Sequence, residues 1–155
     1  MKTLTIFTPA YNRVHTIPRT YESLCRQTCN DFEWLVIDDG STDNTKELVE
    51  GWIAEGKIPI RYIKQENQGM HGAHNTAYRN INTELNTCID SDDWMPDDAV
   101  EKIVGFWKQY GSDKYAGIVG LDRIETGEII GAKFPENLKT TTLQGYYARG
   151  GSGDK

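Results

Sequence analysis

Hydrophobic and polar positions follow two different periods along this chain, and the two periods alternate. Short, nearly continuous apolar runs beside glycine or proline are typical of strands that are covered on both faces. Each run here is followed by turn residues or by a helical pattern. These runs predict strands at residues 4–8, 34–38, 60–64, 87–89 and 118–121, and a hairpin over residues 124–130 around Thr126-Gly127.

Between these runs, apolar residues recur every three or four positions, which is the spacing of one helix face. The first stripe lies in residues 16–27 and has Pro18 in its first turn, where proline is well tolerated. Polar residues that favour helix N-caps precede the second stripe. The first stripe consists of Ile17, Tyr21 and Leu24, and the second of Leu48, Val49, Trp52 and Ile53, with Ser41, Thr42 or Asp43 as its N-cap. A third helix is predicted over residues 72–80. A fourth helix, opened by Pro96, carries Val100, Ile103, Val104 and Trp107.

Alternating strands and helices predict an α/β fold with a mostly parallel sheet and helices on both faces. The length of 155 residues fits a single domain, residues 1–155. In such sheets, ligands bind outside the carboxyl ends of the strands. Polar segments follow four of the predicted strands, at residues 8–11, 38–41, 66–75 and 88–98. We therefore expect a binding site at this edge of the sheet.

Composition narrows the ligand class. The formal net charge of −6 argues against binding to nucleic acid or to an anionic membrane surface, which requires a basic face. The three cysteines form no C-x-x-C pair, which favours free thiols in a reducing compartment. The first residues resemble a strand more than a signal peptide, and no run of about 18 apolar residues indicates a membrane span. We expect a cytoplasmic protein.

The segment CIDSDDWMPDD, residues 88–98, gathers five carboxylates directly after an apolar run. Like charges this close repel one another unless something compensates them. Asp97 and Asp98 follow Pro96, and we assign them to a first helical turn, where the helix dipole favours acids. Asp90 and Asp92 have the hard oxygen ligands that Mg²⁺ and Mn²⁺ prefer, so a divalent ion is one interpretation. A solvated turn is the other.

The remaining polar segments each have two interpretations. Asp39 can accept a hydrogen bond from a ligand N–H, or it can satisfy backbone donors of a helix-entry turn. Tyr11 can stack on a base or pack under its own loop. His71 and His74 lie where a helix N-terminus can bind phosphate; a zinc site is the weaker alternative, because no cysteine lies nearby in sequence.

In order and spacing, four stretches resemble family 2 glycosyltransferases of the GT-A fold. The stretches are TPAYNR at 8–13, SLCRQTCNDFEWLVIDDGSTDNT at 23–45, ENQGMHGAHNTA at 66–77 and CIDSDDWMPDDAV at 88–100. No single one of them is specific, but their order is. The resemblance implies a Rossmann-like GT-A fold and a nucleotide-sugar donor, often a UDP-sugar, whose anomeric carbon is inverted during transfer.

The resemblance also implies roles for individual residues. Asp39 would accept a hydrogen bond from the base, and Asp90 and Asp92 would form the D-x-D pair. Asp92 would contact the Mn²⁺ or Mg²⁺ ion directly, while Asp90 would lie nearer the ribose or a metal-bound water. Met70 and His74 stand where the family often has a basic residue. The residues implied to line the nucleotide pocket are Thr8, Ala10, Tyr11, Asp39, Asn67, Gly69, His71 and Asp90.

One expected component has no counterpart in these motifs. An acceptor hydroxyl must lose a proton, and the family usually supplies an Asp or Glu base well downstream of the D-x-D pair. We expect that base, and the part that binds a saccharide or lipid-linked acceptor, to lie outside this truncated chain, which a further segment could attach to a membrane. The downstream acids, none in a recognisable base motif, are Asp93, Asp97, Asp98, Glu101, Asp113, Asp122, Glu125, Glu128, Glu136 and Asp154.

Two alternatives to this function stay open on sequence alone. A phospho-accepting receiver domain also holds Mg²⁺ with acids at strand ends, but its acid pair would follow the first strand and a lysine the fifth. Here the first strand ends in Thr-Pro-Ala, and residues 117–122 contain no lysine. A nucleotide-binding module without catalysis is the second alternative. A sugar nucleotidyltransferase of similar fold would show a glycine-rich N-terminal loop with basic residues, which the segment TIFTPAYNR lacks.

Overall fold

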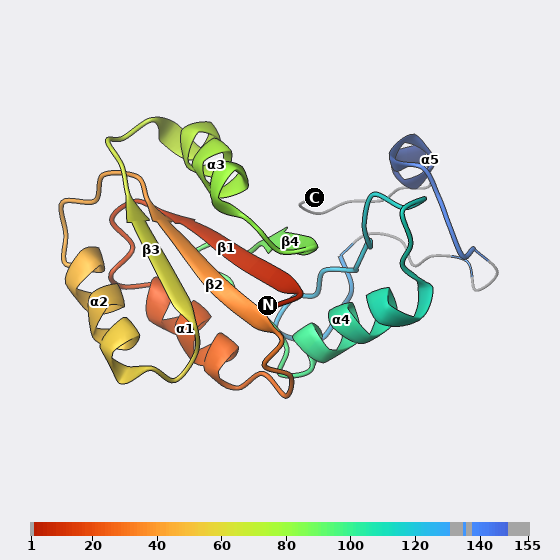
Figure 1. Ribbon diagram of the computed structural model, residues 1–155, viewed down its shortest axis with the longest axis horizontal. Helices are drawn as coiled ribbons and strands as arrows, with labels where there is room; N and C mark the ends of the chain where they lie inside the picture. The colour runs from red at the N-terminus through yellow and green to blue at the C-terminus, as the bar shows by residue number, and fades with distance from the viewer. Residues whose placement is uncertain (1, 131–134, 136–137, 149–155) are drawn as a thin grey trace. The chain divides into compact units, whose positions relative to one another are not determined.

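The computed structural model describes residues 2–130, 135 and 138–148 of the chain. Within it, residues 1–117 and 118–155 form two separate compact units, and each is described by itself. The first unit contains the predicted strand and helix alternation (Figure 1). No helix among the described residues is both long enough and apolar enough to cross a membrane.

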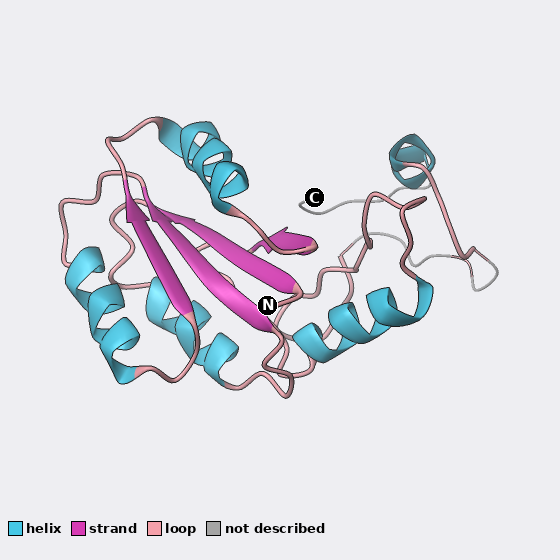
Figure 2. Ribbon diagram, viewed as in Figure 1, coloured by secondary structure: helices cyan, strands magenta, loops and turns pink. Residues whose placement is uncertain are grey.

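Four parallel strands form the sheet, in the order β3-β2-β1-β4. Their carboxyl ends therefore meet at one edge, as the sequence predicted. Register is continuous between the two central strands, from Leu4 opposite Phe32 to Ala10 opposite Asp38. Figure 2 shows the strands between helices. The strands are β1 (Leu4–Ala10), β2 (Phe32–Asp38), β3 (Ile60–Lys64) and β4 (Leu85–Cys88).

Helices cover both faces of this sheet, which confirms the predicted layers (Figure 1). On one face, Tyr21 of α1 (Ile17–Cys25) stacks on Trp52 of α2 (Thr45–Glu55), with ring centroids 4.2 Å apart. Trp34 of β2 lies under both rings. Stacked aromatic rings of this kind bury a large apolar area in a fixed geometry.

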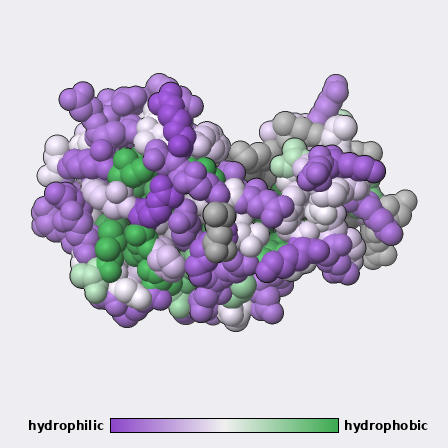
Figure 3. Space-filling view, viewed as in Figure 1, coloured by the Kyte–Doolittle hydropathy of each residue, from purple (hydrophilic) through white to green (hydrophobic). Residues whose placement is uncertain are grey.

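On the opposite face, α3 (Gly69–Asn80) packs small side chains close to the strands. Ala73 and Ala77 contact Phe7, Leu35 and Ile37, and all five side chains are buried. Alanine lets a helix approach a sheet closely, so the α3 backbone lies directly over β1 and β2. Apolar side chains on the surface shown in Figure 3 occur in separate patches within a mostly polar face.

Two helices begin later in the chain than the sequence predicted. The second helix begins at Thr45 with Asn44 as its N-cap, so Ser41, Thr42 and Asp43 are not caps. The last helix of this unit, α4 (Ala99–Tyr110), begins at Ala99, after Pro96, Asp97 and Asp98. The predicted apolar stripes are buried only in part: Leu48, Ile103 and Trp107 are half-buried and Ile53 is exposed, whereas the other stripe residues are buried.

The second unit departs most from the sequence prediction. Residues 118–121 form no strand, and Val119 and Gly120 are exposed. An apolar run gains nothing from the extended conformation when no strand pairs with it. The predicted hairpin is present only as an isolated antiparallel bridge between Arg123 and Ile129, with Gly127 at φ +85° in its turn. A short helix, α5 (Leu143–Ala148), follows. Glu136 and Asp154 lie outside the described residues.

Candidate functional site

The loops after β1 and β2 form one hydrogen-bonded unit. The Asp39 N–H donates to the Ala10 carbonyl over 2.8 Å, directly beyond the last register pair of the two strands. Asn12, in the left-handed region at φ 55°, accepts from the N–H of Thr42 over 2.8 Å. Its own N–H donates to the Ser41 hydroxyl. The polar residues that the sequence offered as helix caps thus fix the β1–α1 loop.

Asp43 completes this connection between the two loops. Its carboxylate accepts from the Val14 N–H over 3.1 Å and from the Thr45 N–H over 3.0 Å. Burial alone would raise the pKa of Asp43, but the Thr45 hydroxyl and these two N–H groups outweigh it and lower the pKa. Asp43 therefore stays ionised and holds the loop at neutral pH.

Asp38 has a structural environment. Its side chain is fully buried, and one oxygen accepts the Ser41 N–H over 2.7 Å. The other oxygen accepts the Tyr62 hydroxyl, and the Lys64 ammonium lies 3.9 Å from it. Burial and the hydrogen bond to Asp38 both raise the pKa of the Tyr62 phenol, which keeps it a donor. Asp38 joins β2 to β3 and to its own loop.

Asp39 connects β2 to the start of α3. It is 4% exposed, and Oδ1 accepts from Gln65 Nε2 over 2.6 Å and from the Gln68 N–H over 2.9 Å. Gln68 is the N-cap residue of α3, so a carboxylate lies at the positive end of that helix. These donors engage one carboxylate oxygen, Oδ1. The Gln68 N–H confirms the role in satisfying backbone donors that the sequence offered for Asp39.

Gly40 allows the β2–α2 and β3–α3 loops to approach. Its φ of +84° is in the left-handed region, and a Cβ there would lie 3.0 Å from the Asn67 nitrogen. Glycine is the residue that adopts this conformation without steric strain. Asn67 in turn accepts the Gly69 N–H over 3.3 Å at the start of α3. Ala10, Asp39, Asn67 and Gly69 therefore come together at the edge formed by β1, β2 and β3.

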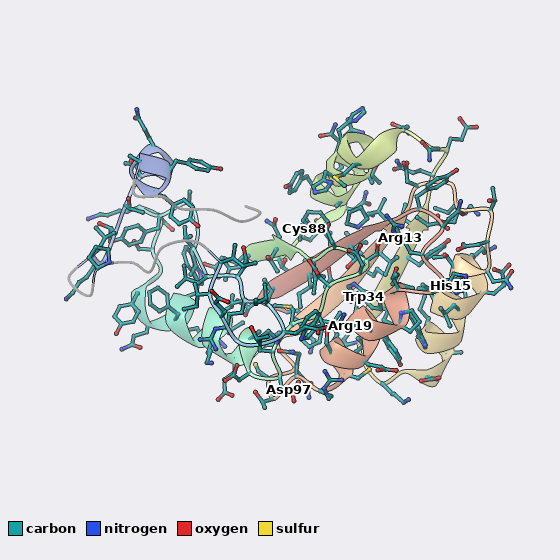
Figure 4. The ribbon with its side chains drawn as sticks, turned by 180° about the vertical axis from the view of Figure 1, so that it is seen from behind. Arg13, His15, Arg19, Trp34, Cys88 and Asp97 are labelled. Atoms are coloured by element: carbon teal, nitrogen blue, oxygen red, sulfur yellow. The ribbon has the colours of Figure 1, made fainter. Side chains whose placement is uncertain are left out.

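The Thr8 side chain is buried, whereas the Tyr11 side chain is exposed. The Thr8 side chain is fully buried, and its hydroxyl accepts the indole N–H of Trp34 over 2.9 Å. Its side chain therefore faces the aromatic layer, and only its backbone is left for a ligand. Tyr11 is 47% exposed at the carboxyl edge. Figure 4 labels Trp34 on β2 and Arg13 in the loop that follows Tyr11.

The first turns of α3 border an open hollow of about 540 Å³. His71 is exposed there, whereas the His74 ring contacts Phe7 edge-on at 5.3 Å and its Nδ1 donates to the Met70 carbonyl. Among the described residues, no third metal-type side chain joins the two histidines. The structure therefore does not favour the zinc alternative. The hollow is lined by Met70, His71, His74 and Asn75.

Three carboxylates converge after β4. One ligand oxygen each of Asp90, Asp92 and Asp93 lies within 4.8 Å of the other two. Asp92 and Asp93 are exposed, and Asp90 is half-buried. The Asp93 N–H donates to the Asp90 carbonyl over 3.0 Å, which closes a turn with Asp92 near its tip. This geometry suits a hard divalent cation, which takes oxygen ligands from carboxylates.

Asp97 and Asp98 are separate from that group. Asp97 pairs with Arg26, the C-cap residue of α1, at 3.1 Å, and Asp98 pairs with Lys102 of α4 at 2.7 Å. These two acids are thus compensated by basic side chains, although they precede the helix and do not lie within its first turn. Figure 4 labels Asp97 and, on α1, Arg19, which lies over the Trp94 ring at 3.5 Å.

Sequence reasoning missed the residues that hold the acidic segment. Thr20 and Ser23 of α1 and Gln27, just after that helix, are buried polar residues whose side chains bond the backbone of residues 90–100. Their spacing of three and four residues marks one face of a helix, and that spacing was the available signal. Gln65 and Gln68, which bond Asp39, were also missed.

Comparison with known proteins agrees with this geometry. The family model "Glycosyl transferase family 2" matches residues 5–152. The chain is 34% identical over 114 residues to glycosyltransferase GlyA of Streptococcus pneumoniae, a match that covers 74% of this chain and 16% of that protein. It is 40% identical over 98 residues to chondroitin synthase of Escherichia coli, covering 63% and 14%. The chain thus spans less than a fifth of either relative.

Solved structures of similar fold contain nucleotides. S. aureus TarS (1–349) in complex with UDP superposes with a TM-score of 0.67 at 28% identity, covering 73% of this chain and 34% of that one. The mannosyltransferase PcManGT of Pyrobaculum calidifontis, in complex with GDP-Man and Mn²⁺, gives 0.62 at 25% identity, covering 68% and 32%. A receiver domain is no longer a competing interpretation. With its parallel sheet and its family match over nearly the whole chain, the protein belongs to glycosyltransferase family 2.

Proposed function

We propose that this chain forms the donor side of an inverting glycosyltransferase, which transfers a sugar from a nucleotide-sugar, a UDP-sugar in the first instance, to an acceptor hydroxyl. The observation that carries the proposal is the convergence of Asp90, Asp92 and Asp93 within 4.8 Å at the carboxyl edge of the sheet. That edge is where doubly wound sheets bind ligands. TarS in complex with UDP supports the choice of nucleotide.

The acidic group fits a divalent ion such as Mn²⁺ or Mg²⁺. Its donors are hard carboxylate oxygens, two of its three residues are exposed, and one oxygen of each residue lies within 4.8 Å of the other two. We assign direct contact to Asp92 and a ribose or water contact to Asp90, with Asp93 beside them. When bound, such an ion stabilises negative charge on a departing nucleoside diphosphate.

The nucleotide would lie along the ends of β1, β2 and β3. Asp39 Oδ2 would accept an N–H of the base, because the protein's own donors engage Oδ1. Tyr11 would stack on the base with its exposed ring, and Ala10 and Thr8 would contribute backbone. Asn67, Gly69 and His71 would contact the nucleotide from the start of α3.

Transfer itself requires a base that removes the proton of the acceptor hydroxyl. For inversion in one displacement, that base stands on the sugar face opposite the leaving group. We place it, and the surface for a saccharide or lipid-linked acceptor, outside this chain. Purified alone, the 155-residue chain should therefore bind donor nucleotide and transfer sugar poorly.

Calorimetric titration of UDP tests this proposal, with and without Mn²⁺. Asp92→Asn removes one carboxylate charge from the acidic turn, and Asp97→Asn removes one from the same segment but outside the turn. We expect Mn²⁺ to strengthen UDP binding to the wild-type chain and to Asp97→Asn, and not to Asp92→Asn. Equal enhancement in all three proteins would remove the metal role from Asp92. No binding of UDP by the folded chain would contradict the donor-site assignment.

A further inference from the structure

We propose that Thr20, a buried residue of α1, is a positioning residue for the metal-binding carboxylates. This inference rests on the proposed metal site, and it assigns the geometry of that site to a helix well separated from it in sequence. Thr20 is fully buried, and its hydroxyl donates to the Asp93 carbonyl over 2.8 Å and, more weakly, to the Asp90 carbonyl at 3.5 Å.

The two carbonyls that Thr20 contacts are the ends of the acidic turn. The Asp90 carbonyl also accepts the Asp93 N–H over 3.0 Å, so the turn is closed once by its own backbone and a second time by the Thr20 hydroxyl. Between these ends lie Ser91, which is buried, and Asp92, which is exposed. The hydroxyl therefore fixes the backbone from which all three carboxylates extend.

The polar stripe that begins on α1 with Thr20 and Ser23 extends to Gln27, just after the helix, and follows the acidic segment. Ser23 Oγ accepts the Met95 N–H over 3.1 Å. Gln27 donates to the Pro96 carbonyl over 2.8 Å and accepts the Val100 N–H over 3.0 Å. Each successive residue of the stripe thus holds a backbone group farther from the carboxylates. The three residues form a graded set, in which only Thr20 touches the turn itself.

Fixing this backbone matters because the carboxylates repel one another. A loop held only by its own bonds would relax toward conformations that separate the three charges. Thr20 bonds to carbonyls and not to carboxylates, so removing its hydroxyl changes neither the charge of the site nor its number of ligands. Loss of the hydroxyl changes only how well the three carboxylates are positioned before an ion binds. Residues that support metal ligands act through this positioning.

A purely structural role would predict a different order of effects. Gln27 makes three hydrogen bonds, because Nε2 also donates to the Ser23 carbonyl over 3.1 Å. Its loss should therefore lower the stability of the fold more than loss of the Thr20 hydroxyl does. If Thr20 positions the carboxylates, loss of its hydroxyl should lower the metal affinity more than loss of Gln27 does, because the Gln27 hydrogen bonds lie beyond the turn.

The test measures Mn²⁺ affinity and stability on the same variants. Mn²⁺ binding is followed by loss of the free-ion electron paramagnetic resonance signal, with and without UDP, and stability by the urea midpoint. We expect Thr20→Val to weaken Mn²⁺ binding about tenfold or more, the usual effect of losing a supporting partner. Thr20→Ser, which keeps the hydroxyl, should bind Mn²⁺ as the wild type does. Gln27→Leu should have the lower urea midpoint and the smaller loss of Mn²⁺ affinity.

The outcomes separate the positioning role from the metal site. Wild-type Mn²⁺ affinity in Thr20→Val, or affinity losses that follow the urea midpoints, would overturn the role of Thr20 and leave the metal site in place. Absence of Mn²⁺ binding to the wild-type chain, with and without UDP, would overturn both. If the Val variant does not fold, Thr20→Ala, which removes the same hydroxyl with a smaller side chain, makes the comparison.

Discussion

Strands β2 and β4 both end in a group of acids, but the fold uses the two groups differently. At the end of β2, Asp38 and Asp39 are buried and accept hydrogen bonds from neighbouring loops. At the end of β4, Asp92 and Asp93 are exposed and lie beside Asp90. A buried carboxylate with several protein donors organises loops, whereas converging exposed carboxylates are available to a ligand. The same pattern in sequence therefore gives buried acids that connect loops at the end of β2, and converging acids, our proposed cation site, at the end of β4.

The largest effect should come from removing a buried acid at the end of β2. Asp38→Ala leaves the buried Ser41 N–H and the Tyr62 hydroxyl without an acceptor, and each unsatisfied group costs about 1–3 kcal/mol. We expect the free energy of unfolding, measured in urea, to fall by about 2–6 kcal/mol in total. Asp92→Ala is the matched control and should change it by less than about 0.5 kcal/mol, as exposed substitutions usually do. Equal losses in the two variants would remove the distinction between the strand ends.

A second comparison separates backbone strain from loop contact. Gly40 and Gly56 both have positive φ, +84° and +66°, so alanine at either should cost about 1–2 kcal/mol. A Cβ on Gly40 would lie 3.0 Å from the Asn67 nitrogen, whereas a Cβ on Gly56 would have no atom within 4 Å. We expect UDP binding, measured by calorimetry, to weaken in Gly40→Ala and to persist in Gly56→Ala. Unchanged UDP binding in Gly40→Ala would show that the contact between these two loops does not shape the nucleotide site.

The smallest effect concerns an acid at the opposite edge of the sheet. The Thr3 hydroxyl, and then Lys108, lower the pKa of Asp31 from 3.8 to about 2. A lowered pKa means that Asp31 stabilises the fold above its unfolded pKa, and that this contribution is lost as the pH falls toward 2. We expect Asp31→Asn to be about 1 kcal/mol less stable than the wild type at pH 7, after allowance for solvent screening.

That difference in stability should shrink as the pH falls from 4 toward 2. Urea unfolding at a series of pH values measures it, with Asp113→Asn as an exposed control. A difference that grows on acidification would contradict the assigned direction of the pKa.

The sequence predicted the parts of the fold that local patterns decide. The continuous apolar run at 34–38 became the end of β2, and Ile17, Tyr21 and Leu24 became the buried face of α1. The run at 118–121 failed because an apolar pattern does not show whether another strand pairs with it. The start of the second helix failed because Ser41, Thr42 and Asp43 bond a loop about thirty residues earlier.

The charged residues of the candidate site could be predicted from the sequence, but the residues that hold them in place through hydrogen bonds could not. The acidic turn after β4 was visible as a run of acids after an apolar segment, and Asp97 and Asp98 were distinguishable by the nearby helix. Thr20 was not, because its partners Asp90 and Asp93 lie some seventy residues away. A hydroxyl on a helix face has no local sign of such a contact. The hydrogen bonds from Gln65 and Gln68 to Asp39 Oδ1 could not be predicted for the same reason.

The most direct test of the central claim locates the bound ion on the molecule. Backbone amide signals of the isotopically labelled chain are recorded with UDP and Mg²⁺, and then with Mn²⁺, whose unpaired electrons broaden nearby signals. We predict that residues 90–93 broaden first and the loops after β1 and β2 next, while Asp31 and Glu84 at the opposite edge stay sharp. Broadening centred on Asp97 and Asp98, or at the opposite edge, would contradict the assignment of the acidic turn as the metal and donor site.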